Sequence, residues 1–128
     1  MAANPVFAVT PRIGMAQVST ANTNYDGVTG TYADVIVGAS TGTRIAEIVI
    51  QATATTTAGM VRLFITDGVT PRLFDEVSVA AATVAANTKA TRVSTVYNNL
   101  ILPNQNWKIF ACTHNAVAIN VIAMGADL

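Results

Sequence analysis

Few residues in this chain could act as catalytic groups, and none of them stands in a recognised catalytic motif. Cys112 is the only cysteine and His114 the only histidine, and on a β-strand their two side chains would share one face. A thiol–imidazole pair also needs an orienting acid and a basic, partly exposed setting, whereas Cys112 lies in an apolar strand pattern. We therefore expect Cys112 to be a small core residue, His114 to lie at a hairpin tip, and the protein not to be an enzyme.

Three carboxylates in the middle of the chain could suggest the acid–base pair of a glycoside hydrolase. Asp75 and Glu76 are adjacent, so on a strand their side chains point to opposite faces and cannot approach one substrate together. Asp67 precedes a glycine, which is typical of a turn. We expect these carboxylates to be solvated or paired with Arg72 and Arg62.

One segment faintly resembles the start of a calcium-binding loop. Asn22, Asn24 and Asp26 alternate before Gly27, and calcium loops use oxygen ligands at such alternate positions. The first of these residues is Asn rather than Asp, and Ala33 occupies the position where such a loop has Glu. Because Asn, Asp and Gly also form ordinary turns, we expect a turn here, with no metal and no other cofactor.

The composition indicates a domain that associates with other proteins. Of 128 residues 52% are hydrophobic and only 11% are charged, against about 25% in ordinary soluble domains. Seven basic residues balance seven acidic ones, which disfavours a nucleic-acid or anionic-membrane partner. The longest nearly apolar stretch, 116–124, is too short for a membrane helix, and residues 1–10 lack a secretory signal pattern. Protein partners are therefore expected to cover the apolar surface.

Alternation of apolar and polar residues predicts an all-β fold, an antiparallel β-sandwich of about eight strands with a jelly-roll-like arrangement. The alanine-rich segment 79–90 is expected to be extended or looped, and residues 1–9 to form an N-terminal arm preceding a single domain, 10–128. Hairpins are predicted at Asp67-Gly68 and at His114-Asn115. The expected strands are 12–20, 32–37, 44–54, 60–66, 72–79, 91–97 with a short continuation at 100–102, 107–113 and 116–124.

The same alternation predicts which residues form the core. Ile48, Ile50 and Ala52 should share one face of their strand, with Glu47, Val49 and Gln51 on the other. The remaining expected core residues are Val61, Leu63, Ile65, Leu73, Val77 and Val79, whereas Arg62 should point outward.

From about Thr43 onward, roughly two-thirds of the chain resembles a family of small virion proteins of tailed bacteriophages. The similar stretches are 55–64 with Asp67-Gly68, 100–103, 107–115 and 120–128. They form a pattern of strands and turns and contain no catalytic motif. The resemblance implies a phage structural protein, and some similar proteins decorate the head as β-sandwich oligomers, commonly trimers.

These observations favour a capsid decoration, or cement, protein that binds the major capsid protein on the outer face of the head shell. It would self-associate, as a homotrimer by the resemblance, and would be made in the host bacterial cytoplasm before it joins the capsid surface. Expected partner contacts are Pro5, Phe7 and Val9 of the arm and Trp107. The main alternative is a tail-fibre or receptor-binding β-module that recognises a host surface glycan. A third alternative, a glycan hydrolase, lacks an acid–base pair.

Overall fold

The computed structural model describes residues 10–128, and within them the chain forms strands and no helix, as the sequence predicts. Strand starts and ends lie within three residues of the predicted ones, and the largest difference is in the last strand, predicted over 116–124 and found over Ile119–Asp127. The eight strands are β1 (Thr10–Val18), β2 (Ala33–Val37), β3 (Thr43–Ala52), β4 (Gly59–Thr66), β5 (Pro71–Val79), β6 (Arg92–Leu102), β7 (Lys108–Thr113) and β8 (Ile119–Asp127).

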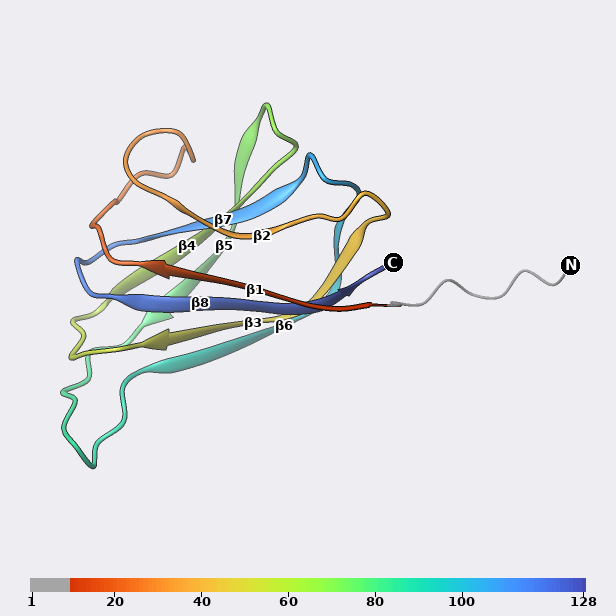
Figure 1. Cartoon of the computed structure of the whole chain (residues 1–128). Coiled ribbons are helices and arrows are strands. Elements are labelled where there is room, and N and C mark those ends of the chain that lie inside the picture. Colours follow the sequence, from red (N-terminus) through yellow and green to blue (C-terminus); the bar gives the residue numbers. More distant parts are fainter. Residues whose placement is uncertain (1–9) are drawn as a thin grey trace, which may run out of the picture.

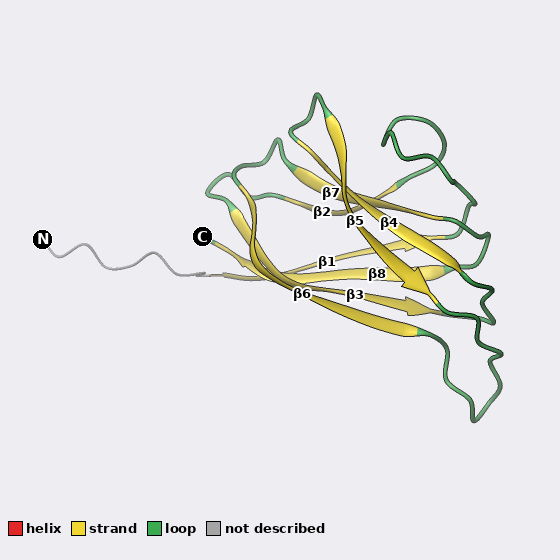
Figure 2. Ribbon diagram, turned by 180° about the vertical axis from the view of Figure 1, so that it is seen from behind, coloured by secondary structure: helices red, strands yellow, loops and turns green. Residues whose placement is uncertain are grey.

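The strands form two antiparallel sheets that face each other (Figures 1 and 2). We call the sheet with the order β1-β8-β3-β6 sheet A and the sheet with the order β2-β7-β4-β5 sheet B. The pairing is nested, because β1 pairs with β8, β2 with β7, β3 with β6 and β4 with β5. Every connection except that between β4 and β5 therefore crosses from one sheet to the other.

The β4–β5 connection is the tight hairpin that Asp67 and Gly68 predict. Gly68 has a φ of 97°, a left-handed conformation that glycine adopts without steric cost. The Asp67 carboxylate accepts hydrogen bonds from the backbone amides of Val69 and Thr70, at 2.9 and 2.8 Å. The side chain thus satisfies the turn's own donors.

The predicted final hairpin at His114-Asn115 is wrong. The segment after β7 carries the chain out of sheet B and into sheet A, where β8 lies between β1 and β3. Turn-forming residues indicate a change of direction, and they do not determine which sheet the next strand joins. The stretch 92–102 also differs from prediction: it is one strand with a register shift opposite Ala46.

The main core lies between the sheets and contains the residues predicted on one face of β3, namely Ile48, Ile50 and Ala52. Val61, Leu63, Val77 and Val79 are buried there as expected, with Ile65 partly buried against them. Arg62 points away from this core, as predicted, yet it is only 6% exposed. Leu73 packs in a second cluster, with Phe64, Phe110 and Cys112, on the outer face of sheet B.

Candidate interaction surface

The two residues considered as a catalytic pair do not form one. Cys112 is 1% exposed, as expected for a core residue, and burial raises the pKa of its thiol, which keeps it protonated. The hydrogen bond formed by His114 joins its backbone amide to the carbonyl of Met60, at 2.8 Å. Within residues 10–128, no group of three His, Cys, Asp or Glu side chains is placed to hold a metal ion.

The neighbouring carboxylates serve structural contacts on opposite sides of sheet B. The carboxylate of Asp75 accepts a 2.6 Å hydrogen bond from the hydroxyl of Tyr97. Because β5 and β6 are edge strands of different sheets, this bond links the two sheets along one edge of the sandwich. Glu76 points the other way and pairs with Arg62 at 2.9 Å, one of the two partners predicted for it. Asp75 and Glu76 therefore do not face a common substrate.

The segment that resembles a calcium loop is a self-contained turn between β1 and β2. The buried side chain of Asn22 donates to the carbonyls of Thr29 and Thr31 and accepts two hydrogen bonds from Asn24. The Asp26 carboxylate accepts the backbone amides at 28 and 29, and these bonds hold its pKa below the usual range. The side-chain oxygens of Asn22 and Asp26 thus already have partners within the loop.

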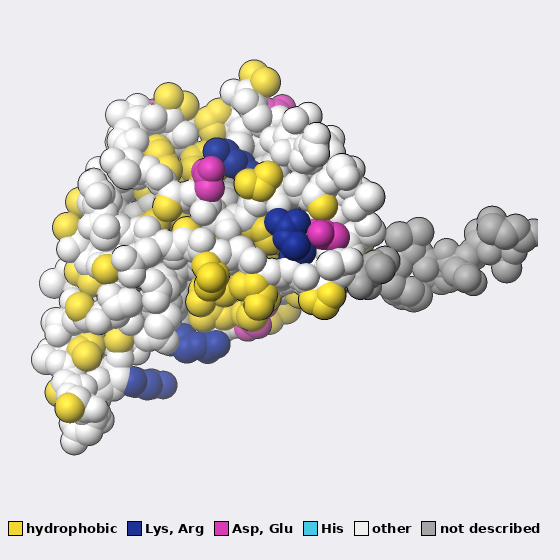
Figure 3. Space-filling view, in the orientation of Figure 1, with side chains coloured by type: hydrophobic (Ala, Val, Ile, Leu, Met, Phe, Trp, Pro, Cys, Tyr) yellow, Lys and Arg dark blue, Asp and Glu magenta, His cyan; other side chains and the backbone are white. Residues whose placement is uncertain are grey.

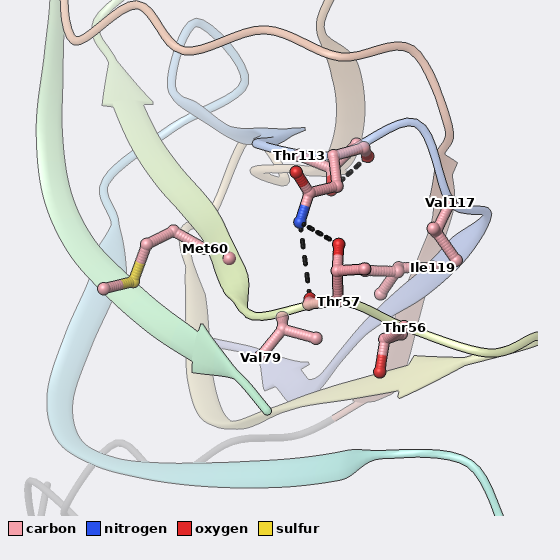
Figure 4. A pocket seen from close by; sticks show the side chains of 9 residues that line it. Thr56, Thr57, Met60, Val79, Thr113, Val117 and Ile119 are labelled. Atoms are coloured by element: carbon pink, nitrogen blue, oxygen red, sulfur yellow. Dashed lines mark hydrogen bonds between the residues drawn. The ribbon is translucent and has the colours of Figure 1, made fainter. Parts of the chain in front are cut away.

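A small cavity lies where the β3–β4 connection meets the β7–β8 connection (Figure 4). Its volume is about 10 Å³, close to the minimum for one water molecule. The Asn115 side chain donates to the carbonyl and hydroxyl oxygens of Thr57, at 3.3 and 2.9 Å, and so joins the two connections. The cavity is too small for a substrate.

The outer face of sheet B is apolar and is covered by the β1–β2 loop. Phe64 and Phe110 stack with ring centroids 5.3 Å apart, and Tyr32 of the loop meets both rings edge-on. Gly27 lies so close that an added Cβ would come within 2.8 Å of Pro71. Smaller clusters of this kind form where a long loop covers a sheet. The loop therefore gives this sheet its own cover.

The same loop explains why Arg62 is buried. Its guanidinium lies 4.2 Å from the centroid of the Tyr25 ring, donates to the Tyr25 hydroxyl at 2.8 Å and pairs with Glu76. Alternation placed Arg62 on the correct face of its strand. The β1–β2 loop covers that face, and its Tyr25 lies 37 residues from Arg62 in the sequence. No periodicity within β4 carries this information.

The outer face of sheet A is also apolar, and within the described residues no loop covers it. The strand registers place its side chains in four rows across β1, β8, β3 and β6. The rows are Pro11–Ala126–Arg44–Ile101, Ile13–Met124–Glu47–Val96, Met15–Ile122–Val49–Ser94 and Gln17–Asn120–Gln51–Arg92. We call these sixteen positions the apolar face, because nine of them are apolar.

Large side chains on this face are open to solvent. Ile13 is 64% exposed, Met15 73% and Val96 72%. Figure 3 shows hydrophobic side chains gathered over β1 and β8, where these rows begin. An antiparallel sheet with one solvated face normally alternates apolar and polar residues, whereas β8 carries apolar residues on both sides. A strand with this pattern is suited to burial on both faces.

The predicted partner contacts have different outcomes. Trp107 is partly buried and packs against the main core, and its backbone carbonyl accepts the amide of Gly38 at 2.9 Å. Its role in partner binding stays a prediction. Pro5, Phe7 and Val9 lie outside the described residues. Sequence reasoning missed Ile13, Met15 and Val96 as surface residues, because alternation does not separate a core face from an interface.

In the part of the chain that the structure describes, no helix is long and apolar enough to cross a membrane. Comparison of the sequence with known protein families and with curated proteins finds no match to either.

Proposed function

We propose that this protein is a structural protein of a phage virion, of the capsid decoration type, which binds the major capsid protein and stabilises the head shell. The observation that carries the proposal is the apolar outer face of sheet A, on which Ile13, Met15 and Val96 are exposed. Large exposed apolar patches mark protein interaction sites, and permanent interfaces are more apolar than transient ones.

The rest of the molecule supports an assembling role. The core is closed between two sheets, so the domain can present a rigid surface without changing shape on binding. The nested strand pairing supports the jelly-roll arrangement, which is common in viral capsid proteins. The low charge fits a surface that stays covered, since charged residues are depleted at interface centres. The resemblance to phage virion proteins agrees with this proposal.

The direct test is to image purified virions of the phage that encodes the protein. We expect a cryo-electron map to show density for this sandwich at regular positions on the outer head shell. A genome-encoded deletion should lower the temperature at which the heads rupture. A complete shell map without the protein, with head stability unchanged by the deletion, would reject the proposal.

A second candidate function, glycan recognition by a tail-fibre module, is favoured by one feature of the opposite face. An open groove of about 450 Å³ lies between the β1–β2 loop and the β4–β5 hairpin. Tyr32 and Phe110 line it beside the ion pair of Lys108 with Asp34, at 2.9 Å, and aromatic rings with polar groups at their edges suit sugars. A glycan array with the full chain and with the variant Lys108→Ala tests this function. A glycan that the parent binds and the variant does not would support it, and no binding by the parent would contradict it.

A further inference from the structure

We propose that the free edge of β6 pairs with the same edge of a second copy of this chain about a two-fold axis. Residues 92–96 of the two copies would run antiparallel, so that the two A sheets join into one continuous sheet. The outer face of sheet A stays open in this arrangement. The inference therefore goes beyond the proposed function, because it names a second contact that leaves the face assigned to the capsid protein free.

Edge strands expose unpaired backbone groups, and proteins usually protect them with short strands, proline, charged side chains or a cover. Three of the four sheet edges in residues 10–128 have such protection. β1 and β2 cover each other: an added Cβ at Gly14 would overlap the carbonyl of Val35, and the Arg12 guanidinium donates to the carbonyl of Val37 at 2.8 Å. β5 begins with a proline and carries charged residues at positions 72, 75 and 76.

The fourth edge, β6, has no such protection in its first half. Among the strands that the structure describes, β6 is the longest, at 11 residues. Between Arg92 and Tyr97 it contains no proline, Arg92 is its one charged residue, and its register with β3 is regular up to Val96. An exposed edge of this kind is a template for another strand.

The pairing with β3 shows which backbone groups of β6 are free. The amide of Ala52 donates to the carbonyl of Thr91 at 2.9 Å, so these two residues form a hydrogen-bonded pair. Because such pairs alternate along an antiparallel ladder, residues 93 and 95 also bond to β3. The N–H and C=O groups of residues 92, 94 and 96 therefore point away from β3, toward the place of an added strand.

One register places these free groups of the two copies opposite one another. With Ser94 opposite Ser94 of the second copy, Arg92 of each copy lies opposite Val96 of the other. The ladder then contains about six backbone hydrogen bonds, two for each hydrogen-bonded pair. It ends before the register shift that follows Val96, so it uses only the regular part of the strand.

The charges fit the same register. Glu47 lies beside Val96 in its row on the outer face, and Arg92 of the second copy would lie on the other side of Val96. The Cα atoms of Glu47 and this arginine would be two strand spacings apart, about 9.6 Å, and the arginine stem can lie along the valine to reach the carboxylate. Arg92 is exposed and makes no ion pair within residues 10–128. The axis repeats this contact, so each copy gains a partner for its arginine.

The joined sheet would place two apolar outer faces side by side. The contact itself involves one strand of each copy, so it belongs with the weak interfaces, below about 1,200 Å². Two linked faces that bind one shell reinforce each other, because the second binding event becomes intramolecular. A weak dimer in solution is therefore sufficient for a stronger attachment on a surface with many binding sites.

The first test is sedimentation equilibrium of the purified full chain at concentrations up to about 1 mM, with hydrogen exchange of single backbone amides measured by NMR. We expect a reversible dimer of twice the 13.3 kDa chain mass. The amides of Ser94 and Val96 should exchange more slowly as the concentration rises, whereas those of Val93 and Thr95 should be protected at every concentration. A monomer throughout, or a trimer, contradicts the proposal.

The second test is Ser94→Pro, which removes the central donor of the added ladder. The amide of Ser94 points away from β3, so the variant loses no hydrogen bond within its own sheet, and circular dichroism should show an unchanged fold. The dissociation constant should rise by more than about 30-fold, because both copies lose a donor. Ser94→Ala is the matched control: it removes the hydroxyl that donates to Glu47, keeps the amide and should dimerise like the parent. Equal dimerisation of Ser94→Pro and the parent would overturn the edge contact.

Charge reversal tests the register without altering the backbone. Arg92→Glu and Glu47→Arg should each weaken the dimer about three- to tenfold, since each places like charges near one another at two symmetric positions. The variant that carries both changes should recover parental affinity. A double variant weaker than both single variants would overturn this register.

Two results would assign the edge to another occupant and overturn the dimer. Loss of the dimer on deletion of residues 1–9 would make the arm the occupant. A chain that is monomeric throughout, and that no longer binds phage heads as Ser94→Pro, would make the occupant a strand of the capsid protein. Met15→Asp, on the outer face, should lower head binding and leave the dimer intact, so failure of this inference and failure of the capsid role are distinguishable.

Discussion

Replacing Asn22 by Ala should uncover the outer face of sheet B while leaving the main core intact. The Asn22 side chain makes four hydrogen bonds, and these close the β1–β2 loop on itself. Two go to the carbonyls of Thr29 and Thr31, both at 3.1 Å, and Asn24 supplies two, at 3.0 and 2.8 Å. Alanine can replace none of them. The loop should then lose its fixed shape above the Phe64–Phe110 stack.

The magnitude follows from these four bonds. An intramolecular hydrogen bond contributes about 0.5–1.5 kcal/mol net, so four of them amount to about 2–6 kcal/mol. Thr29 and Thr31 are exposed, so water can replace the lost partner at their carbonyls, which places the expected loss near 2–3 kcal/mol. For a domain of this size that corresponds to a fall in Tm of roughly 10 °C.

The assay is thermal unfolding followed by near-ultraviolet circular dichroism, which reports the packing of aromatic side chains, Tyr25 and Tyr32 among them, together with hydrogen exchange of the loop amides. Asn104→Ala is the matched control, since Asn104 accepts one bond, from the amide of Asn106 at 2.9 Å, and should cost at most about 1 kcal/mol. Asn22→Ala should melt about 10 °C below the parent and Asn104→Ala at most about 4 °C below it. If the two variants melt within about 2 °C of each other, where at least about 6 °C is expected, the loop is not held by this side chain and the reasoning fails.

Three further predictions concern the bond between the two sheets and the β1–β2 loop. Tyr97→Phe removes the 2.6 Å bond to Asp75 and should lower the free energy of unfolding in urea by about 1–2 kcal/mol; an unchanged midpoint would contradict a link between the sheets. Gly27→Ala adds a Cβ 2.8 Å from Pro71 at a φ of 73°, so it should cost about 1–3 kcal/mol by the same measurement, and a stabilised variant would refute that packing. The folded-state pKa of Asp26 is lowered, so its stabilisation is present above the unfolded pKa, about 3.9, and is lost as the pH falls below it. Lower protection factors of the loop amides at low pH, after correction for the intrinsic exchange rate, should show this, and Asp26→Asn should remove the dependence.

The sequence predicted the strands well, because alternation is a local property of the chain. It placed Ile48 and Ile50 on the core face of β3 and anticipated the hairpin at Asp67. It did not predict that β7 and β8 belong to different sheets, or that Arg62 lies beneath a loop. Both depend on contacts between segments distant in sequence, which no local period encodes. The candidate interface was missed for the same reason.

Besides the main core, apolar residues gather on the outer faces of both sheets. On sheet B, loop 19–32 covers the outer apolar side chains, and the chain provides polar groups such as Asn22 to hold that loop in place. On sheet A, the side chains of Ile13, Met15 and Val96 have no such cover among the described residues. A chain that buries one outer face by means of its own loop, and carries apolar residues on both sides of β8, has a second outer face built for burial. Under the proposed function, the cover of that face is the major capsid protein of the head shell.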